Sequence, residues 1–185
     1  MSKEQIKKIA IKHFNQFGYD GTKMAQIAEE AGIRKQSLSY HYPTKKVLLM
    51  EVYKEVIEEE CTFVRHYFEE NKEEPLEKQL YDFITEHKNR FLTEPNVTLM
   101  YSLSFITPLE VHDFVLSQFR MYLTALKEVL RLCFTRHKSR LSPEECTIAF
   151  VTMLDGLDIQ LVYETRLAYE RAQKITWDIY WKGIQ

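Results

Sequence analysis

Basic side chains near the N-terminus stand at positions where helices are expected to begin. A helix N-terminus already carries partial positive charge, so each added cation costs a few tenths to about 1 kcal/mol. An anionic partner such as a phosphate backbone would offset this cost. The positions concerned are Lys23 after the expected N-cap Thr22, Arg34 and Lys35 after Gly32, and Lys45 and Lys46 after Thr44.

A later expected helix start has the opposite composition. The segment Ser142-Pro143-Glu144-Glu145 combines a cap, a proline and two acids, as a favourable helix start does. Residues 1–50 hold nine Lys and Arg against four Asp and Glu, a net charge of +5. The whole chain holds 25 against 27, which leaves 16 against 23, a net of −7, for the remainder. A basic segment that suits a polyanion therefore precedes an acidic body.

Composition favours a soluble, all-α chain. Of the 185 residues, 45% are hydrophobic and 28% charged, and only five are glycines, too few for a sheet with many turns. We expect a cytoplasmic protein, because the first residues form no secretory signal and the most apolar segment, 148–163, is predicted to be too short and too interrupted by aspartates for a membrane span. Three scattered cysteines predict neither a disulfide framework nor a metal site.

Apolar periodicity and five prolines between the periodic segments predict about nine helices. The first three form a small domain, residues 1–45, and the others form a larger body, residues 46–185. The helix from about 44 to 70 is expected to join them. The predicted ranges are 3–17, 22–31, 34–41, 44–70, 76–92, 96–105, 109–137, 143–168 and 171–182.

Two short helices separated by a turn at Gly32 are typical of a helix-turn-helix, whose second helix enters the DNA major groove. The segment from Phe14 to Thr22 resembles the LF-x-x-x-GY-x-x-T signature of tetracycline-repressor-like (TetR) regulators. Residues 27–33, IAEEAGI, resemble the family's IA-x-x-AGV, and residues 37–45, SLSYHYPTK, resemble its SLYYHF-x-SK. The resemblance covers about 45 residues, and its weight comes from three motifs in order.

The resemblance implies a homodimeric transcription regulator with a three-helix DNA-binding domain and a helical domain that binds a small-molecule effector and dimerises. It implies that Lys35, Gln36 and Ser37 face the major groove and that Thr22, His41 and Lys45 touch phosphates. Side-chain chemistry agrees, because glutamine pairs with an adenine edge and lysine with guanine. Together with the cations at the helix starts, the predicted DNA-binding residues are Thr22, Lys23, Arg34, Lys35, Gln36, Ser37, Tyr40, His41 and Lys45.

Two positions depart from the family pattern. Ser39 stands where the family usually has a phosphate-contacting tyrosine, and Ala25 stands where an arginine sometimes reads a base. Tyr40 can supply the missing phenol from the next position or can pack in the domain, and the same alternatives apply to His41. Tyr42 is assigned to the core.

The body is interpreted as a sensor. Its aromatic residues either line a cavity or form plain core. Asp155 and Asp158 interrupt the most apolar helix, where a carboxylate must be paired, exposed or functional, and an aspartate in a pocket would favour a cationic, apolar effector. The predicted ligand-binding residues are Phe63, Tyr67, Phe105, Phe119, Tyr122 and Asp155. The predicted dimer contacts are Asp158, Leu161, Trp177, Tyr180 and Trp181.

Enzymatic chemistry is not indicated. The glycines form no phosphate-binding or nucleophile motif, and no histidine follows a glutamate at the spacing of di-iron bundles. We therefore expect no enzyme activity, cofactor, metal or membrane partner. The hypothesis is a repressor that an unidentified small molecule releases from a palindromic operator in double-stranded DNA. The alternative is a helical ligand-binding dimer whose basic domain is a protein-interaction module.

Overall fold

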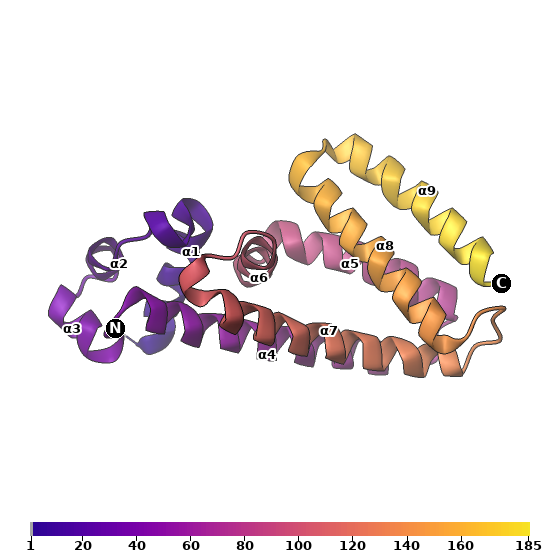
Figure 1. Cartoon of the computed structure of the whole chain (residues 1–185), viewed down its shortest axis with the longest axis horizontal. Helices are drawn as coiled ribbons and strands as arrows, with labels where there is room; N and C mark the ends of the chain where they lie inside the picture. The colour runs from indigo at the N-terminus through magenta and orange to yellow at the C-terminus, as the bar shows by residue number, and fades with distance from the viewer. Residues whose placement is uncertain (1) are drawn as a thin grey trace. The chain divides into compact units, whose positions relative to one another are not determined.

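The computed structural model describes residues 2–185, and regular structure in this range is entirely helical (Figure 1). The all-α prediction is confirmed. The elements are α1 (Lys3–Gly21), α2 (Met24–Glu30), α3 (Lys35–His41), α4 (Lys45–Glu70), α5 (Leu76–Thr93), α6 (Pro95–Phe105), the 3₁₀ helix η1 (Leu109–Val111), α7 (His112–Thr135), α8 (Pro143–Tyr163) and α9 (Arg166–Ile184).

Helix α1 begins with a capping box and ends later than predicted. The Ser2 side chain accepts from the Gln5 backbone, and the Gln5 side chain accepts from the Ser2 backbone. The chain does not leave the helix at Gly18, the predicted end. It kinks there, with φ 67° and ψ 179°, and helical turns resume as far as Gly21. Only glycine adopts such a conformation without strain.

The turn between α2 and α3 is a Schellman motif built on Gly32. Its φ of 64° lets the Gly32 N–H donate to the Glu29 carbonyl and the Ile33 N–H donate to the Ala28 carbonyl. The start of α2 corrects the prediction. Its N-cap is Lys23, which makes no side-chain capping bond, whereas Thr22 ends α1.

The inner faces of the first helices form a dry core. Ile27, Leu38 and Tyr42 are completely buried, which confirms the assignment of Tyr42 to the core. The Tyr42 hydroxyl donates to Glu51 on α4, and burial followed by the Glu51 charge raises the pKa of Tyr42 to about 12. Lys7 on α1 pairs with Glu51 and Glu55, so α4 is held to α1 by charge as well as by apolar contact.

Packing divides the chain into two compact units, residues 1–60 with 90–122 and residues 61–89 with 123–185. The predicted domain boundary at residue 45 falls inside the first unit and stays a prediction. The first unit contains α6, which packs on α1, and the Asn15 side-chain amide donates to the Pro95 carbonyl across this contact. The first unit also includes α4 as far as Glu60, although the helix itself runs without a break to Glu70.

Helices α8 and α9 pack side by side as a hairpin in the second unit (Figure 1). Their boundary corrects the predicted helix 143–168. The chain is extended at Glu164, and the Thr165 hydroxyl accepts from the Ala168 N–H to cap α9. The predicted helix 109–137 is likewise two elements, η1 and α7.

Helix α8 contains the most apolar segment of the sequence. Its 21 residues are long and apolar enough to cross a membrane by length and composition, as those of a buried core helix can also be. The segment 148–163, which was predicted to be too short for a span, lies within this longer helix. Seven of its residues, Cys146, Thr147, Phe150, Val151, Leu154, Leu157 and Asp158, are buried in the structure.

Candidate nucleic-acid interface and ligand-binding helices

One face of α3 is exposed and carries the residues expected to read bases. Leu38 turns inward and is fully buried, whereas Lys35, Gln36 and Ser37 are exposed. Arg34 is the N-cap of α3 and is exposed as well, but its side chain makes no capping bond. The buried leucine thus fixes the helix so that three hydrogen-bonding side chains of its first turn project outward.

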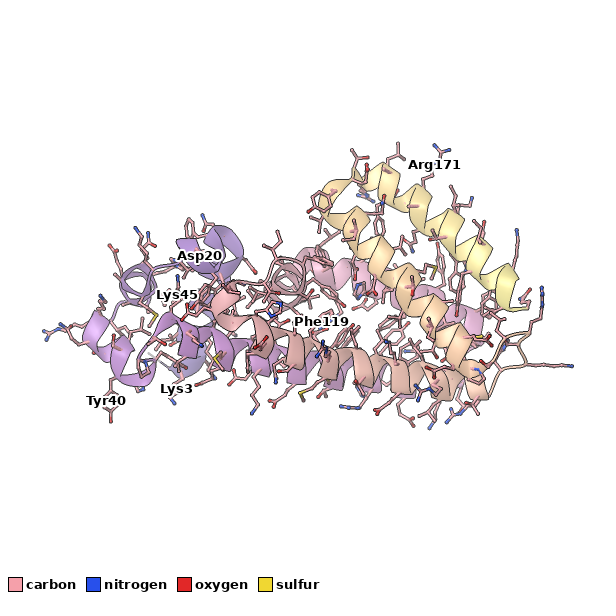
Figure 2. The ribbon with its side chains drawn as sticks, viewed as in Figure 1. Lys3, Asp20, Tyr40, Lys45, Phe119 and Arg171 are labelled. Atoms are coloured by element: carbon pink, nitrogen blue, oxygen red, sulfur yellow. The ribbon has the colours of Figure 1, made fainter. Side chains whose placement is uncertain are left out.

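The end of the same helix carries two exposed rings. Tyr40 is 85% exposed and projects away from the helix (Figure 2). Its ring lies edge-on to His41, with the ring centroids 5.3 Å apart. Both side chains therefore lie outside the core, and the packing alternative for them does not hold within the protomer. Ser39, the departure from the family pattern, is half-buried.

Thr22 does not present a free hydroxyl. It is 2% exposed, and its Oγ1 lies 2.7 Å from the Gly18 carbonyl and 3.1 Å from the His13 carbonyl, both in α1. The prediction that Thr22 contacts phosphate is corrected: its side chain closes the end of α1 and positions the residues that follow.

Lys45 is similarly engaged inside the domain. Its ammonium donates to the carbonyls of Tyr19 and Asp20 and lies 4.4 Å from the centre of the Tyr19 ring. These carbonyls belong to the last turn of α1, where a cation is favourable. The structure thus gives Lys45 a role in joining α4 to α1, and its predicted phosphate contact would have to form in addition.

The cations at the starts of α2 and α3 have no such partners. Within residues 2–185, Lys23, Arg34 and Lys35 make no side-chain ion pair, and neither helix has an acid in its first turn. Helix α9 also opens on a cation, Arg166, but its guanidinium pairs with Glu170 at 2.8 Å. The unpaired positive charge at helix starts is thus concentrated in the helix-turn-helix.

The aromatic residues proposed to line a ligand pocket fall into two groups. Phe105, Phe119 and Tyr122 surround Tyr101 in the first unit, and the hydroxyls of Tyr101 and Tyr122 are 3.0 Å apart. Figure 2 labels Phe119 on α7. In the second unit Phe63 contacts Tyr67, which packs on Phe68 and Phe83. Both groups remain candidates, each as an aromatic cluster within its own unit.

The two aspartates of α8 have different surroundings. Asp158 is 1% exposed, and its Oδ1 is 2.6 Å from Nε2 of the buried His87 on α5. Its predicted role in a dimer contact is therefore corrected, because the carboxylate is enclosed by its own protomer. Asp155 is exposed to solvent as a whole residue, but its carboxyl group is partly desolvated by the surrounding protein. This desolvation, followed by repulsion from the Asp158 charge, raises the pKa of the Asp155 carboxyl.

The aromatic residues predicted at the dimer interface also pack inside the protomer. Trp177 stacks on Trp181 with centroids 5.5 Å apart, and the Tyr180 hydroxyl donates to the Cys146 carbonyl. All three are less than 9% exposed, so the prediction that Trp177 and Trp181 are surface anchors is corrected, whereas Tyr180 also lines a groove between α8 and α9 and stays a candidate. Leu161 is half-buried and remains a candidate.

An apolar groove lies between α8 and α9, and most of its lining residues are not among the predicted dimer contacts. Its volume is about 690 Å³, and Tyr180 contributes to its lining. Small side chains leave the groove open, and the sequence signal for it is that α8 is apolar on nearly all faces. The remaining lining residues are Ala149, Thr152, Met153, Gly156, Leu157, Gln160, Ala172, Thr176 and Ile179.

A further connection was not expected from the sequence. The Tyr19 hydroxyl donates to the Glu110 carboxylate at 2.7 Å and so ties the end of α1 to η1. Burial of the phenol raises the pKa of Tyr19, and the hydrogen bond to Glu110 raises it further. The two residues are 91 positions apart, and no local pattern marks the pair.

The fold and the exposed face of α3 define a class of protein. It is a helix-turn-helix protein in which the two short helices are followed by a larger helical body. The family profile described as "Bacterial regulatory proteins, tetR family" matches residues 6–52. The HTH-type transcriptional regulator RutR of Escherichia coli K12 is 39% identical over 56 residues, which are 30% of this chain and 26% of that protein. Residues 6–52 are thus similar to the N-terminal segment that defines the TetR family profile.

The chain spans about a quarter of the length of the curated relatives it matches. Solved structures extend the likeness in fold to the whole chain. The transcriptional regulator FadR from Bacillus subtilis, in complex with stearoyl-CoA, has a TM-score of 0.72 at 17% identity and covers 100% of both chains. A transcriptional regulator from Saccharomonospora viridis, in complex with choline, has a TM-score of 0.72 at 18% identity, covering 98% of this chain and 96% of that one.

Proposed function

We propose that this protein is a homodimeric transcription regulator that binds a palindromic site in double-stranded DNA and releases it when a small molecule binds. The observation that carries the proposal is the outer face of α3, where Lys35, Gln36 and Ser37 are exposed over a buried Leu38. A helix placed this way has the form of a recognition helix that enters the major groove.

The exposed residues divide by chemistry into two roles. Gln36 can bind an adenine edge through two hydrogen bonds, and Lys35 can donate to guanine. Lys23, Arg34, His41 and the phenol of Tyr40 are suited to phosphate oxygens, which fix the register of the helix without reading sequence. Tyr40 is exposed, whereas Ser39 is half-buried. This difference favours Tyr40 as the residue that takes the place of the family's usual phosphate-contacting tyrosine.

Dimerisation is proposed through the α8–α9 groove. A two-fold axis lets the same groove meet itself, and the small residues Ala149, Gly156 and Ala172 allow two helix pairs to approach closely. The exposed isoleucines Ile175 and Ile179 on α9 add apolar surface for a partner copy to cover. Such a dimer would present two α3 helices to successive turns of DNA, which is why the site is expected to be palindromic.

Effector binding is proposed for the helical body. The neighbours in fold were solved with ligands as unlike as stearoyl-CoA and choline, so the fold admits ligands of different chemistry. The contact of α1 with α6, and the Tyr19 to Glu110 hydrogen bond, give a ligand that moves α6 or η1 a route to the DNA-binding helices. A ligand that prefers one arrangement of these helices would shift the population between DNA-binding and released states.

Selection of bound duplexes from a random DNA pool tests the proposal. Wild-type protein should enrich a palindrome, and a Lys35→Ala, Gln36→Ala double variant should lose it. A Lys182→Ala, Gln185→Ala variant, altered in exposed residues of the same types at the C-terminus, should keep it. Absence of enrichment by folded, dimeric wild type at low salt would overturn the regulator and favour a protein-interaction module.

A further inference from the structure

Helix α9 borders a second groove, on the side opposite the α8–α9 groove. This α5–α9 cleft lies within the second unit, and its volume is about 710 Å³. Lys174, Trp177 and Asp178 line it from α9, at spacings that place them on one side of the helix. Thr176, which lines the α8–α9 groove, is two residues from Lys174 and from Asp178, about 200° around the helix axis. A partner copy seated in the α8–α9 groove therefore does not occupy the α5–α9 cleft.

The rim of the α5–α9 cleft is negatively charged. Its Lys78 is already held by Asp82, with 3.1 Å between the ammonium and the carboxylate. In the described part of the chain, Glu77 and Asp178 are exposed and make no ion pair. The cleft therefore offers carboxylates to a cation of another molecule. Its charged lining consists of Glu77, Asp82 and Asp178 against Lys78 and Lys174.

The loop between α7 and α8 carries the opposite charge. Residues 136–140, RHKSR, hold three Lys or Arg residues, one His and no acid. The charge of Arg136 acts on Glu69 of the same protomer. Lys138 and Arg140 are exposed and make no ion pair within residues 2–185. These two side chains are therefore the cations that the loop presents to a partner.

Four successive ring contacts connect the cleft to this loop. The Tyr81 and Trp177 rings, which line the cleft, have centroids 5.4 Å apart. Trp177 stacks on Trp181 at 5.5 Å, and Trp181 contacts His137 of the loop at 5.5 Å. The cleft and the loop are thus neighbouring parts of one surface, and the rings at the cleft give a guanidinium a face on which to stack.

The positions of the cleft and the loop along α9 suit a two-fold contact. The Ser139 hydroxyl and the Arg140 N–H both donate to the Ile184 carbonyl, so the loop is held at the C-terminal end of α9 (Figure 1). Ile184 lies six residues beyond Asp178, about 9 Å along the helix. A two-fold axis that crosses α9 between these points brings the loop of each copy to the cleft of the other.

We propose that residues 136–140 of a second dimer enter the α5–α9 cleft, where Lys138 and Arg140 pair with the carboxylates of Glu77 and Asp178. The contact is reciprocal, and its smallest product is a tetramer. The inference goes beyond the proposed function, because it gives one particle four α3 helices and hence the capacity to hold two palindromic sites. The contact uses no residue of the helix-turn-helix.

Light scattering without DNA tests the proposal. Ion pairs between exposed groups are weak and screened by salt. The mass of concentrated wild-type protein should therefore at least double between about 500 mM and about 20 mM salt. A cleft variant, Glu77→Lys with Asp178→Lys, and a loop variant, Lys138→Glu with Arg140→Glu, should each keep the high-salt mass in low salt.

An equimolar mixture of the two variants should regain the doubled mass. The acidic loop of one variant then meets the basic cleft of the other, and the unaltered loop meets the unaltered cleft. Lys3→Glu with Lys8→Glu makes the same change of charge on exposed residues of α1 and should associate as wild type does.

A wild-type mass that does not change with salt, association of either variant alone, or a mixture that does not associate would each overturn the inference. DNA selection is measured separately on wild type and on the loop variant, which should enrich the same palindrome. Absence of DNA selection by a wild type that associates as described would refute the proposed function and leave this contact standing.

Discussion

Helices α3 and α8 use charge in opposite ways. Helix α3 begins at the uncapped Arg34 and turns its cations outward without partners, whereas α8 begins with a reciprocal capping box between Ser142 and Glu145 and buries Asp158 against His87. The short α3 is held by its buried Leu38 and by the Gly32 turn rather than by its own ends. Helix α3, which carries the surface proposed to meet DNA, therefore lacks stabilising contacts that α8 in the body retains.

The buried pair of α8 should give the largest effect. His87→Ala leaves the Asp158 carboxylate enclosed without its nearest partner, and we expect a loss of about 3–5 kcal/mol in the free energy of unfolding. Urea denaturation at pH 7.5 measures it. Lys35→Ala on the exposed face of α3 should change stability by less than about 0.5 kcal/mol.

A double replacement provides the control for this pair. His87→Leu with Asp158→Leu removes both polar partners and should recover much of the stability that the single variant loses. If His87→Ala lowers the free energy of unfolding no more than the surface variant Lys35→Ala does, the buried pair does not stabilise α8, and the proposed difference between α3 and α8 is contradicted.

Base reading by α3 should give the next largest effect. Gln36→Ala should remove about 1–3 kcal/mol of discrimination at one base pair of each half-site and relax the preference there. Arg34→Ala should instead weaken binding to all sequences alike and reduce the slope of the salt dependence by about 1 for each phosphate that the variant no longer binds. Titration of the selected site and its single-base variants at several salt concentrations separates the two, and identical behaviour of both variants would contradict the assignment.

The fold near the N-terminus could be predicted because its determinants are local. Gly32 and the spacing of Leu38 and Tyr42 lie within a dozen residues, and they sufficed to place the turn and the core. The roles of Thr22 and Asp158 could not be predicted, because each is set by a partner elsewhere: carbonyls of the preceding helix in one case, and a histidine 71 residues away in the other.

Roles in the helical body were also hard to predict, because they too depend on partners that are distant in the sequence. Aromatic residues such as Trp177 are equally suited to a core and to an interface, and only the packing of α9 on its own protomer decides between them. Small residues at the α8–α9 groove carry no chemical signal of their own. Their importance follows from the space they leave between two packed helices.

The missing cap of α3 offers a direct exchange between stability and function. Arg34→Asp supplies an N-cap acceptor and a favourable negative charge, and we expect about 1 kcal/mol more stability in urea denaturation. The same change places a carboxylate where phosphate is proposed to lie, so DNA affinity should fall steeply. Ser142→Ala on α8 is the matched control and should lose about 1 kcal/mol by breaking an existing cap. A more stable Arg34→Asp protein with full DNA affinity would remove Arg34 from the interface.

Asp155 should give the smallest effect, and its sign distinguishes it from a capping acid on the same helix. Burial and the Asp158 charge raise the pKa of Asp155 from 3.8, so the folded state favours the protonated carboxyl. That contribution to stability is complete below pH 3.8 and is lost as the pH rises through the raised pKa. Asp155→Asn, which cannot ionise, should therefore be slightly more stable than wild type at pH 7.5, and the difference should shrink as the pH falls toward 3.8. Glu145 has the opposite sign, because hydrogen bonds from the Ser142 side chain and then its backbone lower the pKa of that carboxyl. Glu145→Gln should lose stability at pH 7.5 and match wild type in acid. Thermal unfolding of the three proteins across this pH range makes the comparison, and a destabilised Asp155→Asn at pH 7.5 would show that Asp155 is already paired in the free protein.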